Sequence, residues 1–183
     1  MKIQKLLIAI IPAVIFGCTK PPVYPPEPQI DLQYVLVADT TDTSELHNQI
    51  ILYQLVFKVL DGDGDIGLKQ SDTTAPYTDS LKNNLFISLL KSDNGTYDTV
   101  DMPIALNYRI PYADPIGLNE YYKATVYIDM NFPKDIMEES FDTIKFSFYI
   151  LDRAFHKSNI QTTPPIPIDF RGKIIDTDTL IRD

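Results

Sequence analysis

The residues with the clearest chemical potential in this chain are three aspartates that alternate with glycine, in the sequence Asp61–Gly62–Asp63–Gly64–Asp65. In an extended segment alternate side chains point the same way, about 7 Å apart, so the three carboxylates would face one direction. Calcium takes six to eight oxygen ligands, and carboxylates on a flexible glycine-rich loop supply several of them. The spacing therefore raises the hypothesis of a structural calcium site.

The aspartate loop does not have the pattern of an EF-hand. An EF-hand takes ligands from positions 1, 3, 5, 7, 9 and 12 and has glycine at position 6. Counted from Asp61, Ile66 stands at the glycine position and Lys69 at a ligand position, and the flanking sequence is strand-like rather than helical. The metal hypothesis therefore concerns a different kind of calcium site.

A turn without metal explains the same residues. In water, two charges about 7 Å apart repel by only about 0.6 kcal/mol, which a solvated loop tolerates. Glycine and aspartate are also common in any tight turn. Structural calcium and a metal-free turn both stay open, and the metal-free turn is the simpler interpretation.

Catalytic patterns are not recognisable in the sequence. The chain has two histidines, His47 and His156, and neither lies in a Ser–His–Asp context. There is no phosphate-binding glycine loop and no cluster with zinc-ligand spacing. We expect a protein that is not an enzyme and that needs no cofactor other than the hypothetical calcium ion.

Tyrosines provide the other candidate site. Tyr121, Tyr127 and Tyr149 are predicted on the outward faces of strands, where they would suit a partner or glycan surface because tyrosine is favoured at interfaces. Packing within the sheet face is the simpler interpretation. The chain has no tryptophan, the commonest residue for stacking on sugars, and its net charge of −9 argues against nucleic acid as a partner.

The elements that must position these residues are predicted to be β-strands. Apolar and polar residues alternate in 49–60, 121–130 and 141–152, which is typical of strands with one buried face. On this pattern Phe146 and Phe148 are core residues. About seven or eight such strands without helices between them predict an all-β fold, an antiparallel immunoglobulin-like β-sandwich.

Three local features refine this fold. Asn94–Gly95 between two strand-like runs predicts a hairpin, and 133–140 is the helix candidate. If 49–60 is strand B and 141–152 is strand F, the loops after them lie at the same end of the sandwich. Asp152 and Asn159 would then lie near the aspartate loop, and Asp152 would join the calcium site. Without metal, Asp152 would pair with Arg153 or accept hydrogen bonds from backbone N–H groups.

The first residues have the layout of an exported lipoprotein. Lys2 and Lys5 precede an apolar segment too short to span a bilayer, which needs about 20 apolar residues. Ile15–Phe16–Gly17–Cys18 resembles the lipobox of bacterial lipoproteins, and Cys18 is the sole cysteine. We expect residues 1–17 to be a signal peptide and Cys18 to carry the acyl chains that hold the protein on the membrane.

A proline-rich stretch, residues 18–29, follows the lipobox. Such a sequence prefers an extended conformation and would hold the next domain about 30 Å from the bilayer. We assign 30–170 to the β-sandwich and 171–183 to a C-terminal tail. Acidic residues directly after the cysteine, typical of surface export, are missing from Thr19–Lys20–Pro21–Pro22, which favours a periplasm-facing position at the outer membrane over the cell surface.

The lipobox with its tether, the strand ending in DGDGDIGL and the turn Asp152–Asn159 together resemble cell-envelope lipoproteins of Bacteroidota that carry immunoglobulin-like domains. The turn is similar to a D-x-A-G-x-x-S-N pattern in which Phe155 replaces the usual glycine, so its conformation is expected to differ locally. The resemblance implies a non-catalytic accessory or structural subunit of a larger outer-membrane protein assembly. The alternative is a ligand-binding lipoprotein that captures a glycan or another nutrient.

Overall fold

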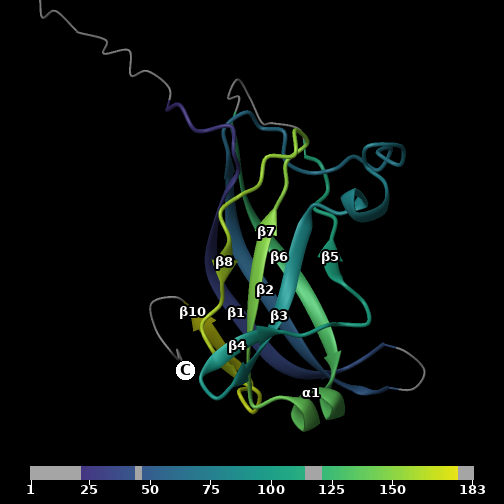
Figure 1. The fold of residues 1–183 in the computed structure, drawn as a ribbon, viewed down its shortest axis with the longest axis vertical. Helices are drawn as coiled ribbons and strands as arrows, with labels where there is room; N and C mark the ends of the chain where they lie inside the picture. The colour runs from purple at the N-terminus through teal and green to yellow at the C-terminus, as the bar shows by residue number, and fades with distance from the viewer. Residues whose placement is uncertain (1–21, 44–46, 114–120, 177–183) are drawn as a thin grey trace, which may run out of the picture.

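The computed structural model of the chain describes residues 22–43, 47–113 and 121–176 (Figure 1). The predicted signal peptide, the lipobox and Cys18 lie outside the described residues. The described part is a sandwich of two antiparallel sheets, as the alternating sequence pattern predicts.

The first sheet has the strand order β10-β1-β2-β6. Its strands are β1 (Gln29–Thr41), β2 (Gln49–Asp61), β6 (Tyr122–Pro133) and β10 (Lys173–Asp176). The second sheet has the order β4-β3-β7-β8, with β5 paired with β3 and β9 paired with β7. Its strands are β3 (Leu85–Asp93), β4 (Thr96–Thr99), β5 (Leu106–Tyr108), β7 (Thr143–Ile150), β8 (Gln161–Thr162) and β9 (Ile166–Pro167).

The core lies between the inner faces of β2 and β7. Every residue predicted to face inward on these two strands is buried: Ile51, Tyr53, Leu55, Phe57, Val59, Ile144, Phe146, Phe148 and Ile150. Aromatic rings bridge the sheets, with Tyr53 edge-on to Phe146 at 5.4 Å between ring centroids and Phe57 tilted against Phe148 at 5.0 Å. The predicted core positions Phe146 and Phe148 are confirmed.

The predicted hairpin and helix are also confirmed. Asn94 and Gly95 connect β3 to β4 and have φ angles of 49° and 87°, the left-handed values that a two-residue hairpin of type I′ requires. The helix α1 (Lys134–Ser140) connects β6 to β7 and buries Met137. A short 3-10 helix, η1 (Asp79–Lys82), lies in the connection between β2 and β3.

The sandwich extends beyond the predicted limits of 30–170. Pro28 is buried, and β10 lies within the segment 171–183 that the sequence assigns to a tail, where it pairs with β1 from Tyr34↔Asp176 to Val37↔Lys173. Ile175 of β10 is buried in the core. The apolar pair Ile174–Ile175 is too short to show period-2 alternation, so only its pairing with β1 identifies it as a strand.

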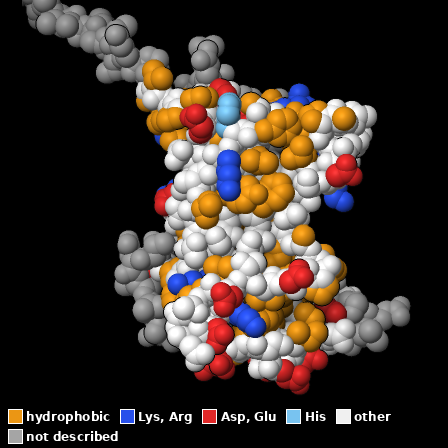
Figure 2. Space-filling view, viewed as in Figure 1, with side chains coloured by type: hydrophobic (Ala, Val, Ile, Leu, Met, Phe, Trp, Pro, Cys, Tyr) orange, Lys and Arg blue, Asp and Glu red, His pale blue; other side chains and the backbone are white. Residues whose placement is uncertain are grey.

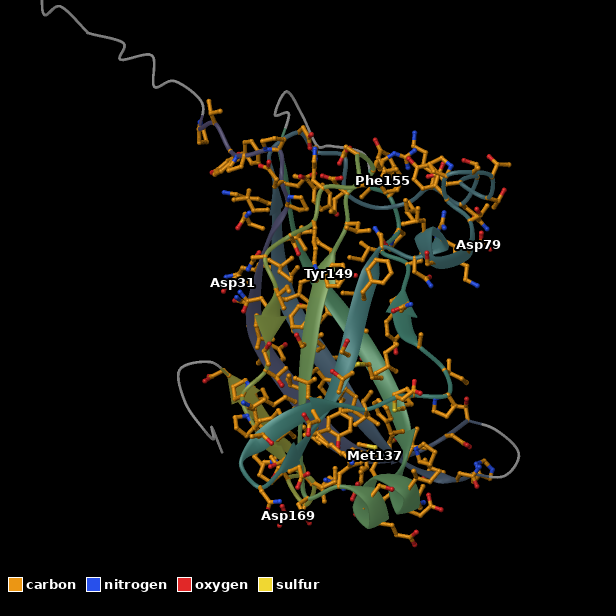
Figure 3. All side chains as sticks on the ribbon, viewed as in Figure 1. Asp31, Asp79, Met137, Tyr149, Phe155 and Asp169 are labelled. Carbon is orange, nitrogen blue, oxygen red and sulfur yellow. The ribbon has the colours of Figure 1, made fainter. Side chains whose placement is uncertain are left out.

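The strand arrangement places the β2–β3 and β7–β8 connections at one end of the sandwich and α1 at the other (Figure 1). Figure 3 shows this separation through its labelled residues, with Phe155 of the β7–β8 connection at one end and Met137 of α1 at the opposite end. The described tether residues enter at the end that carries Phe155 (Figure 1). The loop with the aspartates and the chain's entry point therefore share one end.

Candidate metal centre

Four aspartates meet at the tether end of the sandwich. One carboxylate oxygen each from Asp61, Asp63, Asp65 and Asp152 lies within 4.8 Å of the others. Asp61 is the last residue of β2, and Asp152 follows the end of β7 in the opposite sheet. The structure thus brings Asp152 to the aspartate loop, as the sequence predicts.

The spacing of these oxygens suits a single calcium ion. Calcium binds oxygen at 2.3–2.6 Å, so two of its ligands are at most about 5 Å apart. The four carboxylates meet this limit, and glycine separates the three that come from the aspartate loop. Hard oxygen ligands without nitrogen or sulfur favour calcium or magnesium over zinc.

The residues that follow the aspartate loop are fixed by packing and by a backbone hydrogen bond. Gly64 and Gly67 have φ angles of 70° and 87°, which glycine adopts without steric cost. A Cβ at Gly67 would lie 2.5 Å from the carbonyl oxygen of Pro111. Next to it, the N–H of Leu68 donates to the carbonyl of Ile110 at 3.0 Å. The chain after Asp65 is therefore fixed against the segment that follows β5.

Asp152 is oriented by His156 in the β7–β8 connection. One Asp152 oxygen accepts the backbone N–H of His156 at 2.7 Å, and the other lies 2.8 Å from its Nδ1. In the same loop, the backbone N–H of Arg153 donates to Asp65 at 3.3 Å. The two acidic loops are thus linked directly to each other.

Phe155 stands at the position where the resembled turn has glycine, and its φ angle is 68°. The backbone therefore has the left-handed conformation that glycine favours, although the residue is phenylalanine. The prediction that the larger residue changes the turn locally stays a prediction. The Phe155 ring packs against Tyr77 at 5.9 Å between centroids, a contact that glycine could not make.

Asp61 is the most unusual member of the cluster. Its exposed fraction is 0%, and neither carboxylate oxygen has a hydrogen-bond partner. Burial raises the pKa of Asp61 to about 7, and the charges of Asp63, Asp65 and Asp152 act in the same direction. The backbone N–H of Asp65 opposes them without reaching hydrogen-bonding geometry. A buried carboxylate with two unpaired oxygens is the arrangement expected of a metal ligand.

The other carboxylates share this electrostatic environment. Burial raises the pKa of Asp65, and the charge of Asp152 adds to the effect. Burial also raises the pKa of Asp152, while its hydrogen bonds with His156 lower it. These raised pKa values mean that the surrounding groups do not fully stabilise the ionised form of these carboxylates.

Cations of the protein do not neutralise the cluster. Among the ion pairs of the described residues, only the one between His156 and Asp152 involves it. The alternative that Asp152 pairs with Arg153 is wrong, because the Arg153 guanidinium pairs with Asp72. Asp152 does accept a backbone N–H, as the metal-free alternative expects. Within the described part of the chain, one half-exposed imidazole is therefore the only ion-pair partner of the four carboxylates.

Asn159, which is predicted to lie near the aspartate loop, uses its side-chain amide in another contact. Its side-chain amide holds the first residues of β1, because Oδ1 accepts the N–H of Ile30 at 2.8 Å and Nδ2 donates to the carbonyl of Ile30 at 2.9 Å. Both ends of the amide are occupied by this contact. His47, the other histidine, lies in the β1–β2 connection and takes no part in the cluster.

The three candidate tyrosines do not form one surface. Tyr127 lies on β6 and is 58% exposed, whereas Tyr149 lies on β7 in the other sheet. Tyr149 stacks on Phe86 at 5.1 Å, with the ammonium of Lys157 3.8 Å from its ring centroid. These contacts match the simpler interpretation of packing within the sheet face. Tyr121 contacts the tether and is considered below.

Within the residues that the structure describes, none of the helices has the length and apolar sequence needed to cross a bilayer. Comparisons of the chain with protein-family models, with curated proteins and with solved structures gave no significant match.

Proposed function

We propose that this protein is a lipid-anchored, non-catalytic cell-envelope protein whose β-sandwich binds one calcium ion through Asp61, Asp63, Asp65 and Asp152. The observation that carries the calcium proposal is Asp61, which is completely buried and unpaired in a cluster of carboxylates. An unsatisfied buried polar group costs about 1–3 kcal/mol, and more when it is charged. A divalent cation would remove this cost by pairing all four charges.

The bound ion would have a structural role in the domain. Asp61 ends β2 of one sheet and Asp152 follows β7 of the other, so a shared ion would tie the two sheets together at the tether end. This role needs no substrate and no open coordination position. The absence of a recognisable catalytic pattern in the sequence is consistent with it.

Calcium binding is tested by calorimetry on the purified protein. We expect a heat of binding at millimolar calcium or below, and a melting temperature that rises with calcium and falls with chelator, because the ion binds the folded state. Magnesium should substitute poorly, since it demands a tight octahedral arrangement. Combined Asp63→Asn and Asp65→Asn should abolish the response in a protein that still folds.

The matched control is Asp98→Asn, which removes one charge from an exposed position on β4. This variant should bind calcium as the wild type does. If the wild type gives no heat of binding and its melting curve ignores chelator, the aspartates form a metal-free turn and the calcium proposal is wrong.

Membrane attachment through Cys18 is the second part of the proposal. It is supported by the lipobox-like sequence before the sole cysteine and by the proline-rich residues after it. Cys18→Ala should leave a protein that is unacylated and either soluble or unprocessed, as judged by mass spectrometry and membrane fractionation. Acyl chains found on the Cys18→Ala variant would contradict the assignment.

As a biological role we propose an accessory or structural subunit of a larger outer-membrane assembly, facing the periplasm. An apolar hollow of about 690 Å³ at the α1 end supports a protein partner, because exposed apolar patches mark interaction surfaces. Ile104 and Ile136 line it and are 80% and 55% exposed. Figure 2 shows acidic side chains gathered at the same end. Purification from detergent-solubilised envelope should recover a membrane partner, whereas binding on a glycan array would support nutrient capture instead.

A further inference from the structure

The tether segment, defined here as Tyr24–Pro28, lies directly on the aspartate loop. A Cβ at Gly62 would lie 2.5 Å from the carbonyl oxygen of Tyr24 and closer still to that of Pro25. Real Cβ atoms essentially never approach another heavy atom within 3.0 Å. Gly62 is therefore the residue that lets the tether backbone reach the loop between Asp61 and Asp63.

Side chains hold the tether segment in this place. The Tyr24 hydroxyl accepts a hydrogen bond from Lys123 Nζ at 3.1 Å, and the same ammonium lies 4.9 Å from the Tyr24 ring centroid. The Tyr24 ring meets Tyr121 edge-on at 5.0 Å. At the other end of the segment, Pro28 is buried. The segment is thus anchored at both ends, by Tyr24 and by Pro28, although Pro25, Pro26 and Glu27 between them are exposed.

The tether segment also reaches the second acidic loop. The hydrogen bond with Asp152 raises the pKa of His156, and the charges of Asp152 and Glu27 act in the same direction. Directly after the segment, Asn159 binds both backbone groups of Ile30. The tether segment therefore contacts the β2–β3 connection at Gly62, and Ile30 of β1, two residues after the segment, is bound by Asn159 of the β7–β8 connection.

We propose that the tether segment is coupled to the calcium site: its docking on Gly62 and the binding of calcium strengthen each other. This inference rests on the calcium site proposed above. Gly62 lies between two ligating residues, so an ion that fixes Asp61 and Asp63 also fixes the backbone on which Tyr24 and Pro25 pack. Coupling between two such events is reciprocal: a displaced tether must weaken calcium binding by the factor by which calcium favours docking.

A single-tryptophan reporter follows the tether. The chain has no tryptophan, so Tyr24→Trp places the sole indole on the docked segment and keeps an aromatic ring for Lys123 and Tyr121. We expect calcium to lower the quenching of this fluorescence by acrylamide and to raise its anisotropy. Combined with Asp63→Asn and Asp65→Asn, the same reporter should not respond to calcium.

Gly62→Ala tests the coupling from the other direction. The added methyl group collides with the carbonyl oxygens of Tyr24 and Pro25, so the tether and the loop must move apart. Calcium affinity measured by calorimetry should then fall at least fivefold, the lower end of typical coupling between sites. Gly95→Ala is the control for a glycine replacement without a collision, because a Cβ there meets nothing within 4 Å although the φ of 87° strains an alanine, and it should bind calcium with unchanged affinity.

The outcomes separate this inference from the proposed function. Normal calcium binding with a tether reporter that ignores calcium, or with unchanged affinity in Gly62→Ala, would overturn the coupling and leave the calcium site standing. Failure of the wild type to bind calcium would overturn both. A reporter that responds to calcium, together with reduced affinity in Gly62→Ala, would support the coupling.

Discussion

Replacing Phe146 with alanine is expected to lower the free energy of unfolding by about 3–5 kcal/mol, the usual cost of removing a buried phenylalanine. Phe146 is completely buried on β7, and its ring lies between Tyr53 at 5.4 Å and Phe132 at 6.2 Å. Those two residues belong to β2 and β6 of the opposite sheet. The substitution would therefore leave a cavity where the two sheets now contact each other through aromatic rings.

Urea denaturation of Phe146→Ala beside Tyr127→Ala measures this effect. Tyr127 is an aromatic residue on a strand as well, but it is 58% exposed, so its removal should cost less than about 1 kcal/mol. A loss below about 1 kcal/mol in Phe146→Ala would mean that the two sheets do not pack through this ring.

Asp61→Asn is expected to change the free energy of unfolding in opposite directions with and without calcium. Without calcium the variant should be more stable than the wild type, because a neutral amide replaces a buried carboxylate that has no partner and three like charges beside it. The gain should be on the order of 1 kcal/mol, because a buried unsatisfied group costs more when it is charged than when it is a neutral amide. With calcium the order should reverse, since the wild type gains about 2.7 kcal/mol when calcium is at 100 times its dissociation constant.

Chemical denaturation in chelator and in excess calcium gives the four stabilities that this comparison needs. Asp98→Asn, exposed on β4, should follow the wild type in both conditions. An Asp61→Asn variant that is less stable than the wild type in chelator would show that the buried carboxylate is satisfied without metal. A variant that keeps the full calcium response would remove Asp61 from the ligand set.

The strands could be predicted from sequence because each of the long ones has one buried face. On β2 every inward residue of the alternation from Ile51 to Val59 is buried, and the outward Val56 is buried as well. On β6 the inward residues Val126 and Ile128 are only partly buried, since β6 is an edge strand, yet the alternation is the same. The short strands β5, β8 and β10 contain too few residues for a period to be visible, and pairing with a longer strand creates them.

The meeting of Asp61 and Asp152 was also predictable, because both follow strands whose connections share one end of a sandwich. Asn159 belongs to the same connection, but its amide is used by Ile30, and topology alone cannot assign a hydrogen bond. The i, i+4 spacing of Asp152 and His156 carried a signal for their pairing. The contact of Gly62 with the tether depends on tertiary packing between segments that are far apart in the sequence, and no local sequence pattern predicts it.

The pairing of β10 with β1 has a consequence for how the chain is made. β1 pairs with its inner neighbour β2 in the first hairpin, whereas its outer neighbour β10 is the last of the described strands. During synthesis, the outer edge of β1 at Tyr34–Val37 stays uncovered until Lys173–Asp176 has left the ribosome. An uncovered strand edge pairs readily with other strands. Nascent or truncated chains that lack Lys173–Asp176 would therefore offer this edge to each other, so correct folding depends on this segment being made.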